Sequence, residues 1–108
     1  MKLILSGFAA LVLIFALPTQ AKGNAEAGQA KSGICAACHG RDGNSPMPKM
    51  YPTLAGQSSA ELEAKLHAYR KGEGSGGPMA ASMIAMAKPL SEDDIANLAA
   101  YFSQQQRR

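Results

Sequence analysis

An apolar run at residues 3–17 leaves only a short length of this chain to form a folded domain. The run follows Lys2 and is itself followed by small and polar residues at 18–21, an order typical of a secretory signal peptide cleaved after Ala21. It covers 15 positions, whereas a bilayer-spanning helix needs about 20 apolar residues, so a retained membrane anchor is the less favoured interpretation. Removal of residues 1–21 from the 108-residue chain would leave 87 residues, at 22–108. A domain of that size gains little stability from an apolar core alone.

The two cysteines, Cys35 and Cys38, stand too close in sequence to join distant segments by a disulfide. With His39 they form the pentapeptide Cys-Ala-Ala-Cys-His, which matches the attachment signature of a c-type haem. In this interpretation the two thiols add to the vinyl groups of the porphyrin, and His39 coordinates the iron from the proximal side. One covalently attached haem c would also help to hold so small a domain together.

Three other kinds of site use a Cys-x-x-Cys pair: a thioredoxin-like redox site, half of a zinc site and a structural disulfide. A thioredoxin-like site belongs to a βαβ pattern, and a tetrahedral zinc site needs a second pair of ligands, for which only His67 remains beside His39. Because His67 lies off the apolar face of its predicted helix, we expect it to face solvent rather than a haem.

Helix signals occur along the rest of the chain, and no strand-like alternation appears, so the predicted class is all-α. Asn24 can cap a first helix that runs straight into Cys35 and buries Ala27, Ala30 and Ile34. Residues 40–57 hold three prolines and three glycines, which predicts a long irregular loop.

Two later helices begin at capping-box sequences. Ser58 with Glu61 predicts a helix that ends near Gly72 and carries an apolar face of Leu62, Leu66 and Tyr69. Ser91 with Asp94 predicts the last helix, with Arg107 and Arg108 near its negative end and an apolar face of Ile95, Leu98, Ala99 and Phe102. Between them, a glycine-rich connection at 72–77 and Pro78 predict a short, weaker helix.

Methionines near this weaker helix are candidates for the sixth iron ligand. Met79, Met83 and Met86 all lie in the segment that could approach the other face of a haem. Three methionines on one helical stripe are ordinarily core residues, and Met47 and Met50 in the loop are likewise candidates for packing. Spacing alone therefore leaves the ligand open among the three.

The segment 22–108 resembles class I cytochrome c, and most closely a single haem domain of the bacterial cytochrome c4 type. The matching residues follow the family's order from end to end, at 27–28 and 31, 35–40, 42–45, 51–57, 90–91, 94–95 and 98–102. The resemblance implies a small all-α fold of three to four helices and a long loop, wrapped around one covalently bound haem. Cytochrome c4 proteins typically carry two such domains, whereas this chain has one Cys-x-x-Cys-His sequence.

The resemblance also implies roles for particular residues. Alignment on Leu90 and Ser91 places the axial methionine at Met83. The backbone carbonyl of Pro52 would accept a hydrogen bond from the ligand histidine, His39, and so fix its orientation.

The resemblance further implies that the first and last helices cross closely. The crossing would place Gly28 against Tyr101 or Phe102, since a residue without a Cβ allows close approach.

The charge pattern gives no sign of a nucleic-acid partner. Loss of Lys2 with the signal peptide would leave 10 basic and 8 acidic residues, a formal charge of +2. The remaining lysines are scattered, at Lys22, Lys31, Lys49, Lys65, Lys71 and Lys88. Such a distribution is typical of a solvated surface, although a lysine rim that steers an acidic partner stays open.

Taken with the resemblance, these features predict an electron-transfer protein rather than an enzyme. We expect a periplasmic one-electron carrier of a respiratory or oxidative chain, with His39 and Met83 as axial ligands, redox proteins as partners, and a monomeric or homodimeric state. One alternative is an electron-accepting haem subunit of a larger dehydrogenase or oxidase complex. Another is a haem enzyme or gas sensor with an open site, although no distal acid–base pair is evident.

Overall fold

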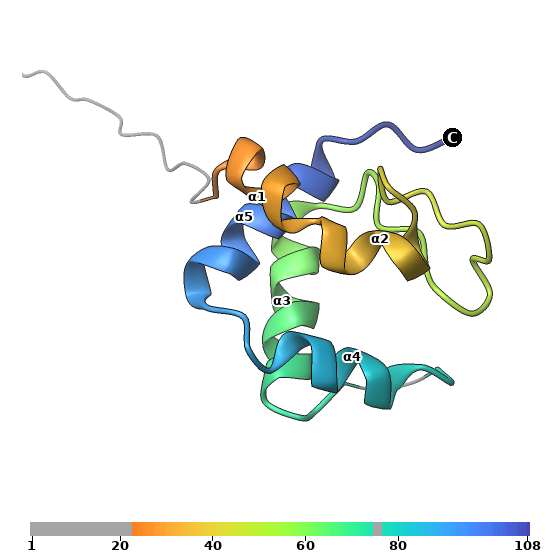
Figure 1. Cartoon of the computed structure of the whole chain (residues 1–108), viewed down its shortest axis with the longest axis vertical. Coiled ribbons are helices and arrows are strands. Elements are labelled where there is room, and N and C mark those ends of the chain that lie inside the picture. Colours follow the sequence, from red (N-terminus) through yellow and green to blue (C-terminus); the bar gives the residue numbers. More distant parts are fainter. Residues whose placement is uncertain (1–22, 75–76) are drawn as a thin grey trace, which may run out of the picture.

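The computed structural model describes residues 23–74 and 77–108, and within them the chain forms five helices and no strand (Figure 1). The all-α class is therefore confirmed. The predicted signal peptide at 1–21 lies outside the described residues, as do positions 75 and 76 of the glycine-rich connection. The described part holds five helices rather than the three to four predicted, because the first helical segment is divided in two.

The division falls at Ser32, between α1 (Ala25–Lys31) and α2 (Gly33–His39). The backbone N–H and the hydroxyl of Ser32 both donate to the carbonyl of Gln29, at 3.1 and 2.7 Å. This tighter bond to the third residue back ends α1, so the single helix predicted to run straight into Cys35 is wrong. The predicted cap is confirmed, since the Asn24 side chain accepts a hydrogen bond of 2.8 Å from the Ala27 N–H.

α1 crosses α5 (Glu92–Ser103) closely, and Gly28 is the buried residue of α1 (Figure 1). A Cβ on Gly28 would lie 2.6 Å from the Asn97 carbonyl carbon and 2.8 Å from the Tyr101 Cβ. The close helix crossing implied by the resemblance is therefore present, against Tyr101. The predicted buried face is wrong: Ala27 and Ala30 of α1 are exposed, because the crossing brings the glycine face of α1 onto α5. Ile34, which belongs to α2, is 44% exposed as well.

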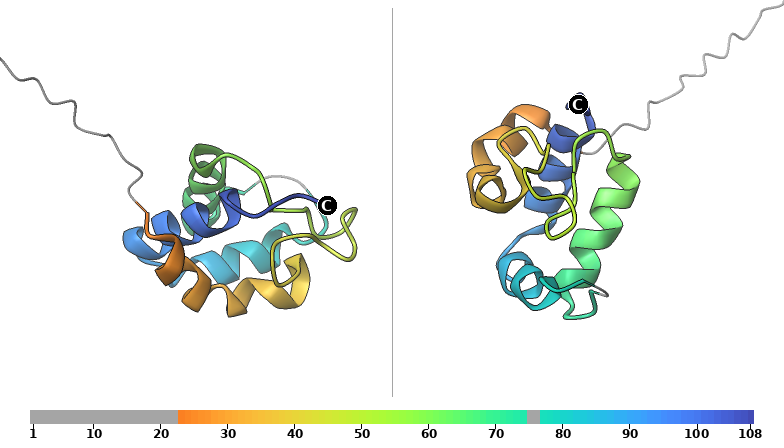
Figure 2. Two further views of the ribbon diagram at one scale, coloured as in Figure 1. Left: turned by 90° about the horizontal axis from the view of Figure 1, so that it is seen from above. Right: turned by 90° about the vertical axis from the view of Figure 1, so that its right-hand side faces the viewer.

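α3 (Ser59–Arg70) extends from the α1–α5 pair to α4 (Ala80–Ala87), as Figures 1 and 2 show. Its cap at Ser58 is confirmed, because the hydroxyl accepts a hydrogen bond of 3.0 Å from the Glu61 N–H. The Glu61 carboxylate lies 3.4 Å from the same hydroxyl rather than completing the capping box on the backbone. Leu62 is buried, and the other two apolar residues of the predicted face pack against the core while half-buried.

α5 supplies most of the core. Ser91 and Asp94 form the full predicted capping box, with both hydrogen bonds at 3.0 Å. The helix buries the four predicted residues together with Ala100 and Tyr101. One local expectation is wrong: the two arginines beyond α5 contact the loop rather than the helix end.

These arginines hold the irregular loop between α2 and α3. The Arg107 Nε donates to the Ala55 carbonyl at 3.1 Å, and the Arg108 guanidinium pairs with Asp42 at 2.8 Å. Within the loop, the Gly43 carbonyl accepts hydrogen bonds from the backbone N–H groups of both Leu54 and Ala55. The loop is therefore ordered by its own backbone and by the C-terminal tail. Over residues 23–74 and 77–108, no helix has the length and apolar character needed to cross a bilayer.

Candidate functional site

Cys35, Cys38 and His39 line a cavity of about 390 Å³. They stand at positions i, i+3 and i+4 of α2, which lie on one face of a helix. The cavity wall facing them is mainly apolar and comes from α3, α4, α5 and the link between α4 and α5, through Leu62, Leu66, Ala87, Leu90, Leu98 and Phe102 among others. Its volume lies in the range of about 300–1,000 Å³ that small-molecule and cofactor sites occupy.

His39 is held in one orientation by the loop. Its side chain is buried, and its Nδ1 lies 2.8 Å from the Pro52 carbonyl oxygen, so the contact implied by the resemblance is present. A carbonyl only accepts hydrogen bonds, and Nδ1 must therefore carry the proton. In a neutral imidazole this leaves Nε2 with the lone pair, the arrangement that a metal-binding histidine needs.

Cys35 and Cys38 form no disulfide with each other, and their setting is unlike that of a catalytic dithiol. Burial, and to a lesser extent the neighbouring Cys38, raise the pKa of the Cys35 thiol to about 11. Thiol–disulfide catalysis instead requires a thiolate stabilised by a lowered pKa. Among the described residues, no group of three or more His, Cys, Asp or Glu side chains is placed to bind a metal ion.

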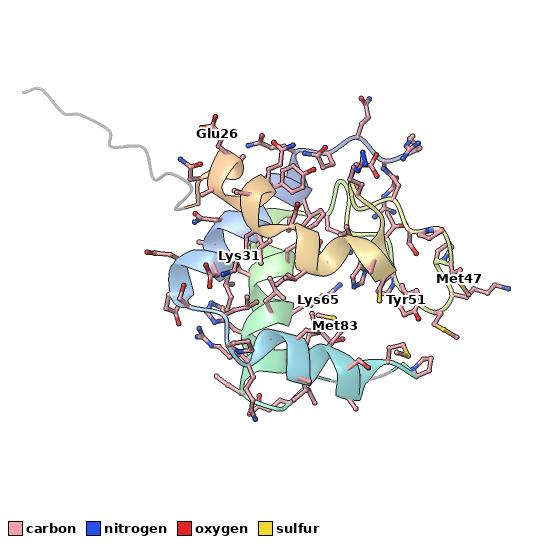
Figure 3. The ribbon with its side chains drawn as sticks, viewed as in Figure 1. Glu26, Lys31, Met47, Tyr51, Lys65 and Met83 are labelled. Atoms are coloured by element: carbon pink, nitrogen blue, oxygen red, sulfur yellow. The ribbon has the colours of Figure 1, made fainter. Side chains whose placement is uncertain are left out.

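All three candidate methionines reach the cavity. Met79 directly precedes α4, while Met83 and Met86 belong to it. Met79 and Met83 are half-buried, whereas Met86 is 42% exposed. Figure 3 shows Met83 projecting from α4 toward the space between α4 and α2.

The two loop methionines, expected to be packing residues, lie at the surface instead. Met47 and Met50 are 52% and 38% exposed and lie outside this cavity, on a separate shallow hollow of the loop. The backbone N–H groups of Met50 and Tyr51 both donate to the Met47 carbonyl, so the loop tip is held by hydrogen bonds of its own backbone.

His67 does not line the cavity. Its Nδ1 lies 3.2 Å from the Arg70 guanidinium, and its Nε2 lies 3.6 Å from a carboxylate oxygen of Glu92. The side chain is half-buried between α3 and α5 rather than fully directed to solvent. The hydrogen bond from Arg70 lowers the pKa of Glu92, with the charges of Arg70 and His67 acting in the same direction.

Polar residues that the sequence does not identify also line the cavity, among them Gln57, Lys65 and Ser82. Lys65 stands three residues after Leu62 and directly before Leu66, so it occupies a position on the apolar stripe of α3. A lysine inside such a stripe is the signal that could have identified it.

The cavity fits a haem attached through the pentapeptide. It combines a mainly apolar wall, two thiols and an oriented imidazole on one side, and methionine sulfurs on another. This is the donor set of a c-type haem with a histidine and a methionine available to the iron.

Comparisons with known proteins agree with this description. The family described as "Cytochrome c" matches residues 23–106. Cytochrome c-554(548) of Halomonas halodenitrificans is 51% identical over 84 residues, which cover 78% of this chain and 99% of that protein. The crystal structure of reduced recombinant cytochrome c4 from Pseudomonas stutzeri has a TM-score of 0.69 and 44% identity, and covers 80% of this chain. The match covers 47% of that cytochrome c4 chain.

A second solved structure extends the likeness to a larger assembly. The thiosulfate dehydrogenase TsdBA from Marichromatium purpuratum has a TM-score of 0.71 and 33% identity. The match covers 90% of this chain and 22% of that one. The family match over nearly all described residues, and a relative matched over 99% of its own length at 51% identity, show that this chain belongs to the cytochrome c family, and it is thus an electron-transfer protein with covalently attached haem c rather than an enzyme.

Proposed function

We propose that this chain is an exported, single-haem carrier that moves one electron at a time in a respiratory or oxidative chain, with His39 and Met83 as axial ligands. The observation that carries the proposal is the cavity itself, where the Cys-x-x-Cys-His face of α2 and the methionines of the α4 segment line one apolar space. Such a cavity suits a bound redox group that needs no substrate access.

The residues around the cavity have separate tasks in this proposal. Cys35 and Cys38 hold the haem by thioether bonds, and the Pro52 carbonyl keeps the His39 ring in a fixed orientation. When bound, the haem supplies an iron that exchanges one electron between its ferric and ferrous states. The apolar wall and a methionine ligand both favour the less charged ferrous state, which raises the reduction potential relative to a bis-histidine site.

Met83 is the proposed ligand among the three methionines. Its position before Leu90 and Ser91 corresponds to that of the axial methionine in the family that the chain resembles. Its half-buried side chain at the cavity supports the choice.

Optical spectra of protein matured with haem test the ligation. We expect a low-spin reduced spectrum and, in the oxidised protein, the weak far-red band of a sulfur-to-iron bond. Met83→Ala should open the sixth position, so that carbon monoxide binds the ferrous protein readily. Met79→Ala and Met86→Ala are the matched controls and should exclude carbon monoxide as the unaltered protein does. If Met79→Ala alone admits it, the assignment to Met83 is wrong.

Export to the periplasm follows from the signal-like residues 1–21. Mass spectrometry of the mature protein should place its N-terminus at Lys22, and fractionation should recover the haem in the periplasm. A mature chain that retains residues 1–21 in the membrane fraction would contradict this part of the proposal. The expected partners are redox proteins, and the expected state is a monomer or homodimer.

A docked subunit of a dehydrogenase or oxidase complex is the second candidate. The likeness to a chain of a thiosulfate dehydrogenase favours it, because a domain of this fold there forms part of a larger protein. Native electrophoresis of extracts from the source organism separates the two candidates. A free carrier migrates alone as a small haem protein, whereas a subunit migrates with a large complex.

A further inference from the structure

Lys65 is an unusual residue for the wall of this cavity. Among the described residues, it is the only lysine or arginine that lines the cavity, and most of its neighbours there are apolar. A lysine commonly lays its methylene stem along apolar surface while its ammonium group stays in water, and Lys65 is exposed. Figure 3 shows the side chain extending from α3 toward the space between α2 and α4.

The Lys65 ammonium group is positioned by the end of the loop. Its Nζ donates a hydrogen bond of 3.1 Å to the Gln57 Oε1, and the Gln57 Nε2 donates one of 2.8 Å to the Thr53 carbonyl. Gln57 is half-buried and also lines the cavity. An ammonium group has three protons and an amide NH₂ group has two, so both side chains keep donors for a further acceptor.

A haem brings two such acceptors. Its propionate carboxylates lie on the edge of the porphyrin opposite the vinyl groups that Cys35 and Cys38 would bind. α2 packs mainly on α1, while α3 packs on α4 and α5. Both views of Figure 2 show α2 and α3 apart, on different sides of the molecule. Because its vinyl and propionate groups lie on opposite edges, a haem attached at α2 would have its carboxylates on the side of the cavity away from that helix.

We infer that Lys65, together with Gln57, binds a haem propionate and neutralises its charge at the α3 side of the cavity. The inference rests on the haem occupying this cavity, as the proposed function requires. A carboxylate is a stronger acceptor for an ammonium group than the amide oxygen that Lys65 contacts in the structure. A role limited to tying the loop to α3 would need only the Lys65–Gln57 hydrogen bond.

Propionate binding by Lys65 affects the reduction potential of the haem, whereas a role limited to tying the loop to α3 does not. The ferric haem carries one more positive charge than the ferrous haem, so it favours the ionised propionate more strongly. The potential therefore falls as the pH rises through the propionate titration. A nearby Lys65 ammonium group lowers the propionate pKa and moves this fall to lower pH.

The experiment is a redox titration of the haem-containing protein as a function of pH. Lys65→Gln should raise the pH at which the potential falls by about one pH unit. This is the low end of the shift expected from an opposite charge at close range, because Lys65 is exposed. Lys65→Arg keeps the charge and should stay near the unaltered protein. Lys71→Gln removes an equal charge beyond the end of α3, away from the cavity, and should change nothing.

The salt dependence of the same titration provides a second measurement. Added salt screens an exposed ion pair. It should therefore raise the pH at which the potential of the unaltered protein falls, and it should leave that pH unchanged in Lys65→Gln. The inference is overturned if Lys65→Gln titrates like Lys71→Gln, or if salt has no effect on the unaltered protein. If the matured protein contains no covalent haem, the proposed function is overturned as well. A high-spin spectrum would refute only the Met83 ligation, and the Lys65 titration would still test the present inference.

Discussion

Gly28→Ala is predicted to destabilise the fold, because the crossing of α1 and α5 leaves no space for a side chain. A Cβ at this position would lie 2.6 Å from the Asn97 carbonyl carbon and 2.8 Å from the Tyr101 Cβ. Both distances are too short for carbon atoms, and the peptide group of Asn97 cannot rotate away as a side-chain end can. The helices must therefore separate, and the effect spreads to the buried residues of α5.

The expected magnitude combines two opposing effects. Overpacking a core costs about 1–3 kcal/mol, and contact with backbone argues for the upper end. Alanine is the better helix former by about 1 kcal/mol. The net loss in the free energy of unfolding is therefore about 2 kcal/mol, or a fall of about 8–16 °C in Tm for a domain of this size.

Denaturant unfolding of the haem-containing protein, followed by circular dichroism, measures this loss. Gly33→Ala is the matched control, because a Cβ at Gly33 would meet no atom within 4 Å. We expect Gly33→Ala to be neutral or slightly stabilising. If Gly28→Ala unfolds at the same denaturant concentration as Gly33→Ala, the argument from close helix crossing is refuted.

Two further predictions concern the surface. Ser91→Ala removes the hydroxyl that accepts a hydrogen bond from the Asp94 N–H. It should lower the free energy of unfolding, measured by denaturant titration, by about 1 kcal/mol. An unchanged denaturation midpoint would show that the capping box does not stabilise α5. The hydrogen bond from the Asn44 backbone N–H, with smaller effects of the Asn44 side chain and the Arg108 charge, holds the pKa of Asp42 below its ordinary value. A carboxylate with a lowered folded pKa contributes stability that is present above its unfolded pKa and is lost as the pH falls. The denaturation midpoint should therefore decrease on acidification below about pH 4, and by less in Asp42→Asn; an equal decrease in both proteins would contradict the assignment.

Local signals predicted the elements of this fold well. Asn24, Ser58 and Ser91 cap helices where the sequence indicates, and the four predicted apolar residues of α5 are all buried. A cap and its N–H partner lie within three residues of one another, and an apolar stripe repeats within two turns. Each signal is complete within its own segment and needs no knowledge of the rest of the chain.

Predictions that depended on distant partners were less accurate. The spacing of Ala27, Ala30 and Ile34 predicts one buried face, whereas α1 contacts α5 at Gly28 and Ile34 belongs to α2. Arg107 and Arg108 were placed at the end of a helix, yet they bind the loop more than fifty residues earlier in sequence. No pattern within either segment specifies these partners.

The candidate site shows the same division between local and distant information. The spacing of Cys35, Cys38 and His39 is enough to predict that they share one helix face, since residues three and four positions apart are neighbours on a helix. In contrast, the packing of α3 and α4 brings the methionines of the α4 segment to the same cavity and places Lys65 in its wall. The helical repeat sets the direction of a side chain relative to its own helix, but the surface that it meets depends on how the helices pack.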